Sequence, residues 1–329
     1  MKNSVFAALF AVLALSVPDP LQAQGIAEDS SRIEMMPYGN FDNWMVHTVK
    51  ESFMIGGKMR ETYEILKADT LRGNEPFVPA GRTPWATSSV MAHVKGIFKA
   101  STTVFPEKRG DGYCARLETR IEDVKVLGIV NLHVLATGTI YTGETLEPVK
   151  NANNPQSKIS RGIPFTGQPK SLIFDYKLKV GGEQYRTSPN GMGKPKALGK
   201  DNVVEVFVYL QHRWEDKDGN LFANRVGTAY EAFSKDVDEW VNGHEIEIRY
   251  GDISKSEGFC DAIALNDKVD TKEVFYALNS EGKNVQLHEV GWSNQKPTHM
   301  IIIFTSGNGG AYVGAPGSKF WVDNVALRY

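Results

Sequence analysis

Aliphatic side chains alternate with polar or aromatic ones along much of the sequence. In residues 203–214 the alternation is nearly unbroken, which is typical of a β-strand whose two faces meet different surroundings. A polar turn at 215–220 leads into a second such stretch at 221–230, so the two stretches predict a β-hairpin. One predicted face of residues 203–214 carries Val204, Val206, Val208 and Leu210, and the other carries Glu205, Phe207, Tyr209, Gln211 and Arg213.

Similar patterns recur through the chain. Residues 129–141 and 171–180 alternate in the same way, and two β-favouring runs within 40–66 flank Gly56-Gly57, a second hairpin signal. Residues 298–305 are apolar on both faces, as in a central strand. About ten strands with turn signals between them indicate an all-β antiparallel sandwich. We find no internal repeat and no linker, so we expect a single domain over residues 39–329.

Two segments depart from the strand pattern. Phe233, Val237 and Trp240 recur at helical spacing, which predicts a short helix over 232–241. Residues 251–296 show no regular period and are predicted to form a long loop insertion.

The C-terminal segment 307–329 joins a glycine-rich loop to a final strand. One predicted face of this strand carries Trp321, Val325 and Leu327, with Asp323 as an exception. We expect the strand to lie beside residues 40–50, so that one sheet holds both ends of the domain. The glycine loop lacks the Lys-Ser/Thr pair of a phosphate-binding loop and is interpreted as a turn.

The N-terminal residues have the pattern of a signal peptide. Lys2 precedes an apolar run over 5–17, and Ala23 offers a small residue for cleavage, so residues 1–24 are predicted to be removed. A short buried helix is the alternative. Residues 25–38 are predicted to be a polar leader. No cysteine follows the apolar run and no later run could span a bilayer. We therefore expect a protein exported to the periplasm or outside the cell, without a lipid anchor or membrane insertion.

Composition narrows the possible partners. The chain of 329 residues has 37 Lys and Arg against 39 Asp and Glu, a formal charge of −2, so no basic excess favours nucleic acid. Two cysteines, Cys114 and Cys260, would pass through an export route that permits a disulfide. Cys114 lies in a strand-like run, and the sequence leaves open whether it pairs or is a small core residue.

Six short motifs occur in order along the chain: Gly39-Asn-Phe-Asp-Asn-Trp, Thr83-Pro-Trp-Ala-Thr, Gly112-Tyr-Cys-Ala-Arg-Leu-Glu-Thr, Arg161-Gly-Ile-Pro-Phe, Phe174-Asp-Tyr-Lys and Gly317-Ser-Lys-Phe-Trp-Val-Asp-Asn-Val. Taken together, they resemble the putative carbohydrate metabolism domain family, whose members are exported by polysaccharide-using Gram-negative bacteria. The resemblance implies a jelly roll like the galactose-binding modules, and a role with glycans, but supplies no catalytic residues. The insertion at 251–296 is longer than the family pattern, and the lipid-anchor cysteine of many relatives is missing.

Sugar binding requires flat aromatic surfaces for the C–H faces of the ring and planar polar groups for its hydroxyls. The polar and aromatic face of residues 203–214 offers both, and residues 171–180 could add to it if the two strands are neighbours. The predicted carbohydrate-binding residues are Asp175, Lys177, Tyr209, Arg213 and Trp214. Alternatively, the aromatic side chains pack under the predicted helix or the insertion. The partner we expect is an oligo- or polysaccharide.

A non-catalytic role is favoured because the signatures HExxH, GxSxG, CxxC and the Walker loop are absent from the sequence. A polysaccharide lyase or glycoside hydrolase would need placed carboxylates, for which Glu205 and Asp175 are candidates. A cell-envelope assembly or adhesion protein is the third hypothesis.

No cofactor is predicted. A structural Ca²⁺ would need six or more oxygens, and only Asp42 and Asp323 can be named for it, if the first and last strands pair. Carboxylates that cap loop amides are the simpler interpretation.

Overall fold

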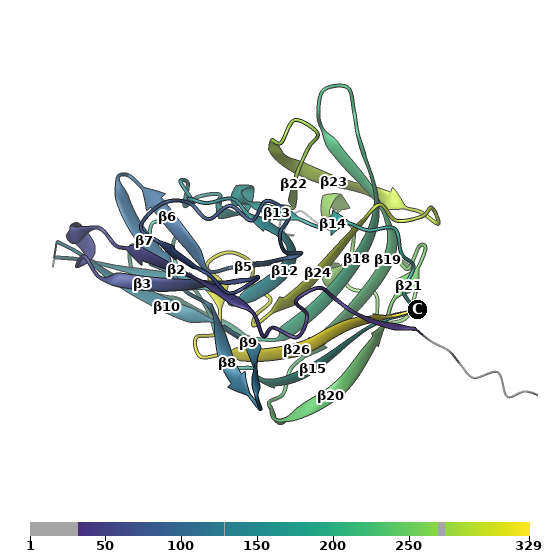
Figure 1. The fold of residues 1–329 in the computed structure, drawn as a ribbon, viewed down its shortest axis with the longest axis horizontal. Coiled ribbons are helices and arrows are strands. Elements are labelled where there is room, and N and C mark those ends of the chain that lie inside the picture. The colour runs from purple at the N-terminus through teal and green to yellow at the C-terminus, as the bar shows by residue number, and fades with distance from the viewer. Residues whose placement is uncertain (1–31, 128, 269–273) are drawn as a thin grey trace, which may run out of the picture. The chain divides into compact units, whose positions relative to one another are not determined.

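The core lies between two curved sheets (Figure 1). The computed structural model describes residues 32–127, 129–268 and 274–329, and Arg32–Tyr329 form one compact unit. The predicted signal peptide, 1–24, lies outside the described residues. The first sheet consists of β20 (Val237–Glu247), β15 (Ser171–Lys179), β26 (Lys319–Arg328), β9 (Gly112–Glu118) and β8 (Val104–Arg109) in spatial order, and β1 (Ile33–Met35) pairs with β26.

The second sheet has ten strands, of which seven form one path. Its neighbours are antiparallel except β19 and β23, which are parallel. The path runs β13 (Ile159–Arg161), β12 (Thr139–Thr145), β24 (His299–Thr305), β18 (Val204–Glu215), β19 (Leu221–Phe233), β23 (Asn284–Trp292) and β22 (Tyr276–Leu278). Three short strands pair beside it: β14 (Ile163–Pro164) with β24, β21 (Arg249–Tyr250) with β19, and β5 (Trp85–Thr87) with β12.

The other described strands form four small sheets, and the described chain also contains short 3-10 turns. The Gly56-Gly57 hairpin is confirmed, and both glycines adopt positive φ (105° and 62°), which other residues rarely tolerate. The small sheets are β3 (Met59–Ile65), β2 (Trp44–Lys50) and β4 (Thr70–Arg72); β6 (Val90–Val94) and β7 (Ile97–Ser101); β10 (Arg120–Val126) and β11 (Val130–Ala136); and β17 (Lys196–Asp201), β16 (Glu183–Arg186) and β25 (Val313–Gly314). The 3-10 turns are η1 (Phe53–Ile55), η2 (Pro155–Lys158), η3 (Asp261–Ile263) and η4 (Asn266–Lys268).

The alternation predicted from the sequence forms the core. Every second residue of β18 and β15 points between the sheets, and Phe174 packs edge-on against Phe304 across the gap at 5.1 Å. Burial of each such side chain contributes about 1.5–3 kcal/mol. The all-β antiparallel sandwich of jelly-roll type is therefore confirmed. The core-facing residues of the two strands are Leu172, Phe174, Tyr176 and Leu178 on β15 and Val204, Val206, Val208 and Leu210 on β18.

The predicted helix over 232–241 is wrong, because Phe233 ends β19 and Val237 begins β20. Val237 and Val241 pair with residues only two apart on β15, so β-bulges insert two extra residues between them. Both valines pack against the core, and their separation of four residues imitates a helical period. Among the described residues the structure has no α-helix.

The predicted neighbour of the last strand is also wrong. β26 pairs with β15, β9 and β1, whereas β2 lies in a separate small sheet. Ile33–Met35 thus form a strand, although the sequence placed them in a loose leader. Asn324, at φ 50°, forms a bulge in β26. Before the bulge the core-facing side chains are Phe320 and Val322, and after it they are Val325 and Leu327.

The long insertion is only partly irregular. Residues 251–268 contain η3 and η4, while β22 and β23 extend the second sheet. β23 pairs with residues 221–225 of β19, so it lies in the same sheet, beside the turn end of the hairpin formed by β18 and β19. No helix in the described part of the chain is long and apolar enough to cross a membrane.

Candidate functional site

A cleft of about 740 Å³ lies on the second sheet, on the side away from the core. Its floor comes from β12, β24 and β18, which are adjacent in Figure 1. The walls come from segments distant in sequence: 152–161, 261–262 with Phe275, and 307–312. The volume falls within the range of about 300–1,000 Å³ typical of small-ligand sites.

The floor is aromatic because β18 turns its aromatic side chains away from the core. Phe207 is half-buried, and its ring lies 5.0 Å from Tyr230 and 5.7 Å from Tyr209. Tyr141 of β12 and Phe275 are buried and complete the aromatic surface. Phe207 is therefore the floor aromatic with the most accessible ring face.

Tyr209 is fixed in place by two contacts. Its hydroxyl donates to Ala262 O at 3.0 Å, and the Arg225 guanidinium lies 3.5 Å from the centre of its ring. Burial raises the pKa of Tyr209, so the phenol stays protonated. Tyr209 links the β18 floor to the 261–262 wall.

Two charged side chains supply planar polar groups. Glu205 lies on the floor, 6% exposed, and accepts a hydrogen bond from Tyr230 Oη at 2.8 Å. Arg161 extends over the Tyr141 and Phe275 rings at 5.3 and 4.6 Å. Carboxylate and guanidinium groups held in this way can bind the hydroxyls of a sugar that lies on the aromatic floor.

The glycine-rich loop forms one wall, a role that the sequence did not predict. Residues 307–312 line the cleft, and Tyr312 Oη donates to Ala152 O at 2.5 Å. Burial raises the pKa of Tyr312. The loop is still a turn between β24 and β25, but it also carries an aromatic residue into the cleft. Tyr312 and Phe275 were missed; the tyrosine among glycines was the available signal for the first, and none marked the second.

The five predicted binding residues lie in four different places. Only Tyr209 lines the cleft. Trp214 lies near the hairpin turn, is 40% exposed and stacks on Phe222 at 5.8 Å. Asp175 and Lys177 lie on the first sheet, because β15 pairs with β20 and β26 and not with β18. The predicted shared face therefore does not exist.

Arg213 is half-buried, and its guanidinium is hydrogen-bonded within the protein instead of lining the cleft. Its Nε donates to Gln211 Oε1 at 2.8 Å and Nη2 donates to Arg161 O at 2.9 Å. Burial lowers the pKa of Arg213 to about 9, with Glu289 opposing the shift. Below it, the buried Glu289 carboxylate accepts from Arg225 at 2.7 and 2.5 Å.

Asp175 and Asp323 face each other across β15 and β26 with Arg109 between them. The Arg109 guanidinium contacts both carboxylates, at 2.9 and 2.6 Å, and stacks on Trp240 at 3.8 Å. Asp42 accepts from the Tyr113 amide at 2.9 Å, as expected for a loop cap. Within residues 32–127, 129–268 and 274–329, no group of three or more His, Cys, Asp or Glu could hold a metal ion.

The two cysteines do not pair. Cys114 is buried in β9 and Cys260 is exposed, and both are free thiols. Burial, with smaller contributions from Asp323 and Glu107, raises the pKa of Cys114 to about 12. Cys114 is thus a small core residue, one of the two roles that the sequence left open.

Three solved structures are similar to this chain at low identity. A putative glycoside hydrolase from Bacteroides thetaiotaomicron has 22% identity and a TM-score of 0.42, over 69% of this chain and 57% of that one. A putative glycoside hydrolase from Bacteroides vulgatus has 14% identity and a TM-score of 0.44, over 90% and 94%. A carbohydrate-binding module specific for non-crystalline cellulose has 11% identity and a TM-score of 0.25, over 77% and 95%. At these TM-scores the three likenesses carry no functional argument.

A family model covers most of the chain. No curated protein matches the chain. A family model described as putative carbohydrate metabolism domain matches residues 41–328, which include both sheets and the cleft, apart from β1. The chain belongs to this family.

Proposed function

We propose that this protein is an exported, non-catalytic glycan-binding protein and that the cleft above Phe207 holds a segment of an oligo- or polysaccharide. The observation that carries the proposal is the half-buried Phe207 ring, which lines the same cleft as two planar charged groups, Glu205 and Arg161. A sugar ring would place its C–H face on Phe207 and its hydroxyls toward the charged groups. Family membership supports a carbohydrate role. Export rests on the sequence of residues 1–24 alone.

The cleft geometry suits binding because its polar groups are already oriented. Tyr230 orients Glu205, while Tyr209 is fixed by Ala262 and Arg225. A site whose side chains are immobilised before the ligand arrives loses less conformational entropy on binding.

The experiment is a glycan array followed by calorimetry on the mature protein. We expect binding to at least one glycan among plant, host and microbial sets, and Phe207→Ala should weaken it about tenfold or more. Trp214→Ala is the matched control, since it removes an exposed aromatic residue of the same strand outside the cleft. The absence of binding to every glycan, or equal losses in both variants, would contradict the proposal.

A second candidate function is glycoside hydrolysis, favoured by one observation: Glu205 and Asp261 both line the cleft. Hydrolases use two carboxyl groups on opposite sides of the scissile bond. Release of reducing sugar from a bound polysaccharide, abolished by Glu205→Gln while binding persists, would establish this function. Binding without any turnover would leave the non-catalytic role.

A further inference from the structure

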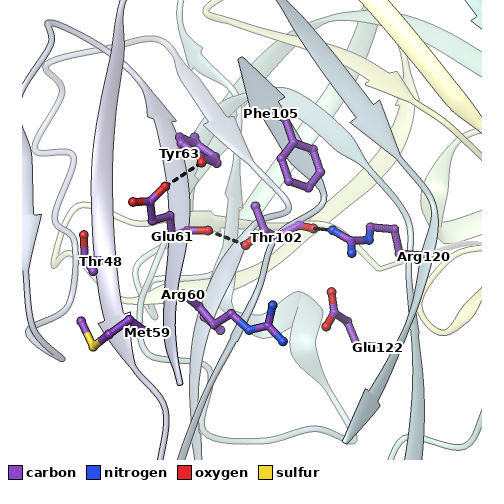
Figure 2. Close-up of a pocket in the computed structure, with 10 residues that line it drawn as sticks. Thr48, Met59, Arg60, Glu61, Tyr63, Thr102, Phe105, Arg120 and Glu122 are labelled. Carbon is purple, nitrogen blue, oxygen red and sulfur yellow. Dashed lines mark hydrogen bonds between the residues drawn. The ribbon is translucent and has the colours of Figure 1, made fainter. Parts of the chain in front are cut away.

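A second pocket, of about 330 Å³, lies between β3 and the strands β8 and β10. It shares no lining residue with the cleft. Figure 2 shows Arg60 of β3 and Arg120 of β10 pointing their guanidinium groups into it from different walls. The pocket is at the lower end of the size range for small-ligand sites, about 300–1,000 Å³.

The two guanidinium groups keep most of their donors unused. Together they carry about ten N–H donors, and among the described residues only Arg120 donates a hydrogen bond, to Thr102 O at 3.3 Å. Arg60 Nε lies 3.7 Å from Glu51 Oε2, too far for a hydrogen bond, and the Arg60 side chain is 46% exposed. The pocket therefore presents two cations that are available to a ligand.

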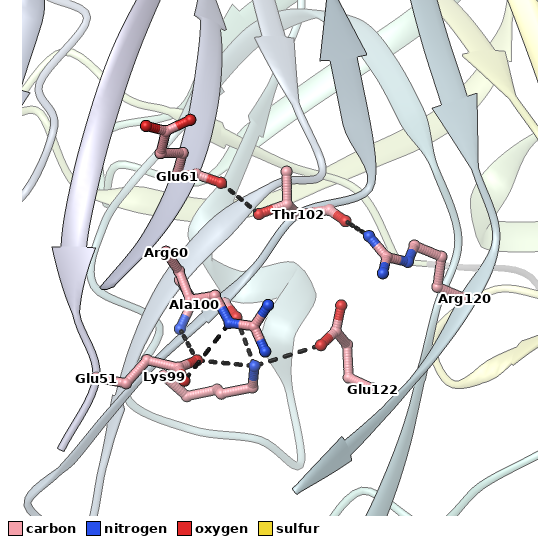
Figure 3. Close-up of polar contacts among 8 residues, drawn as sticks. All are labelled: Glu51, Arg60, Glu61, Lys99, Ala100, Thr102, Arg120 and Glu122. Atoms are coloured by element: carbon pink, nitrogen blue, oxygen red, sulfur yellow. Dashed lines mark hydrogen bonds and ion pairs between the residues drawn. The ribbon is translucent and has the colours of Figure 1, made fainter. Parts of the chain in front are cut away.

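The neighbouring carboxylates already have partners, and Glu51 pairs with both Arg60 and Lys99. Lys99 Nζ contacts Glu51 at 2.8 Å and Glu122 at 3.3 Å (Figure 3). Glu61 accepts from Tyr63 Oη at 2.9 Å. Burial and then Glu61 raise the pKa of Tyr63 to about 12, so the phenol remains a donor at neutral pH. In the described structure the Arg60 Nη groups make no hydrogen bond, and two carboxylates, Glu61 and Glu122, remain in the pocket lining.

One wall is aromatic. The Tyr63 and Phe105 ring centres are 6.1 Å apart with their planes at 51°, which forms a corner beside the two arginines. Arg120 lies over Phe105 at 5.5 Å. Arg116 also lies over Phe105, at 4.3 Å, so Tyr63 is the ring of this wall that we assign to the C–H face of a sugar.

We propose that this pocket binds a single carboxylated sugar, a uronic acid, with its carboxylate between Arg60 and Arg120. Arginine forks match a carboxylate in geometry and charge. Glu61 and Glu122 disfavour a doubly charged anion such as phosphate, but they accept hydrogen bonds from the hydroxyls of a sugar. One carboxylate, several hydroxyls and an apolar ring face are the combination that the lining complements. The inference does not depend on glycan binding in the cleft.

The test is calorimetry or saturation-transfer NMR with glucuronate and galacturonate, compared with glucose and acetate. We expect a uronate to bind and both comparison ligands to bind at least about tenfold more weakly, because glucose lacks the carboxylate and acetate lacks the sugar ring with its hydroxyls. Arg60→Gln and Arg120→Gln should each weaken uronate binding about tenfold. Lys58→Gln is the matched control, because it removes an exposed cation from the same hairpin outside the pocket.

Unchanged uronate affinity in Arg60→Gln would overturn the proposal. The Arg60 variant keeps the test valid if Arg120→Gln disturbs the Thr102 contact, because the Arg60 side chain donates no hydrogen bond in the described structure and has only a long ion pair with Glu51. Acetate binding as tightly as a uronate would also overturn it, since the site would then recognise only an anion. Phe207→Ala should leave uronate affinity unchanged. A loss of uronate affinity in this variant would assign uronate binding to the cleft and contradict a separate site at Arg60 and Arg120.

Discussion

The outer face of β18 has two halves with opposite surroundings. Glu205, Phe207 and Tyr209 form the floor of the cleft, whereas Gln211 and Arg213 form the covered half, a polar network joined to the buried Glu289 of β23. Both halves alternate in the same way along the sequence. The difference arises from the segments that contact each half, which shows that strand periodicity defines a face but not its neighbours.

The covered half places several charges in the interior. Glu289 is fully buried and accepts from both Arg225 and Gln211. Burial alone would lower the pKa of Arg225, but the Glu289 carboxylate outweighs it and the pKa lies above its usual value. Such a network is costly to break because the remaining charge stays buried without a counterion. The two halves should therefore respond to mutation in different ways.

The largest effect is expected in the covered half. Glu289→Gln leaves Arg225 without its counterion and should lower the free energy of unfolding by about 3–5 kcal/mol, as measured by urea denaturation. Glu281→Gln, which removes an exposed partner of Lys283, should change it by less than about 1 kcal/mol. Equal effects of the two variants would contradict the buried network.

Acid should also weaken the covered half. Burial and then Arg213 lower the pKa of His299 to about 4, against about 6.5 in the unfolded chain. The unfolded chain thus binds the proton more readily, so the contribution is complete above about pH 6.5 and is lost as pH falls toward 4.

We expect this group to account for about 1–2 kcal/mol of the lost stability, after allowing for its partial exposure. His299→Gln should flatten that part of the pH profile of urea unfolding. An unchanged slope between pH 7 and 5 in the variant would argue against a buried neutral imidazole.

Tyr209 lies at the boundary between the halves, where a milder change is expected. Tyr209→Phe removes the hydrogen bond to Ala262 O and should cost about 1 kcal/mol of stability. Hydrogen exchange should become faster in the 261–262 wall while the β18–β19 hairpin keeps its protection. Uniform acceleration over both would indicate that the hydroxyl does not specifically hold the wall.

The smallest effect is expected on the first sheet, where two of the predicted binding residues lie. Lys177→Gln removes a cation 4.6 Å from the Trp321 ring and should cost about 0.5 kcal/mol. Glycan affinity measured by calorimetry should not change. A clear loss of affinity would move the binding surface from the cleft to this face.

Much of the fold follows from the sequence because burial enforces the strand period. The hairpin of β18 and β19 and the aliphatic face of β18 were predicted correctly. β-bulges caused two of the errors. Extra residues in β20 imitated a helical period, and the bulge at Asn324 changed the core-facing residues of β26 from even-numbered to odd-numbered positions.

The candidate site was less predictable, since its parts come together only in the folded chain. Tyr209 could be found from alternation, but Phe275 and Tyr312 reach the cleft from distant loops. The pairing of β18 with β24 and β19, and of β15 with β20 and β26, placed Asp175 and Lys177 on the other sheet. Strand order depends on tertiary contacts that a single sequence does not display.

A crystal structure with the tightest-binding glycan from the array would test the central claim most directly. We predict a sugar ring stacked on Phe207 with a hydroxyl in hydrogen-bond contact with Glu205. A glycan bound on the outer face of the first sheet, against Lys177 and Trp240, with the cleft empty, would contradict the account.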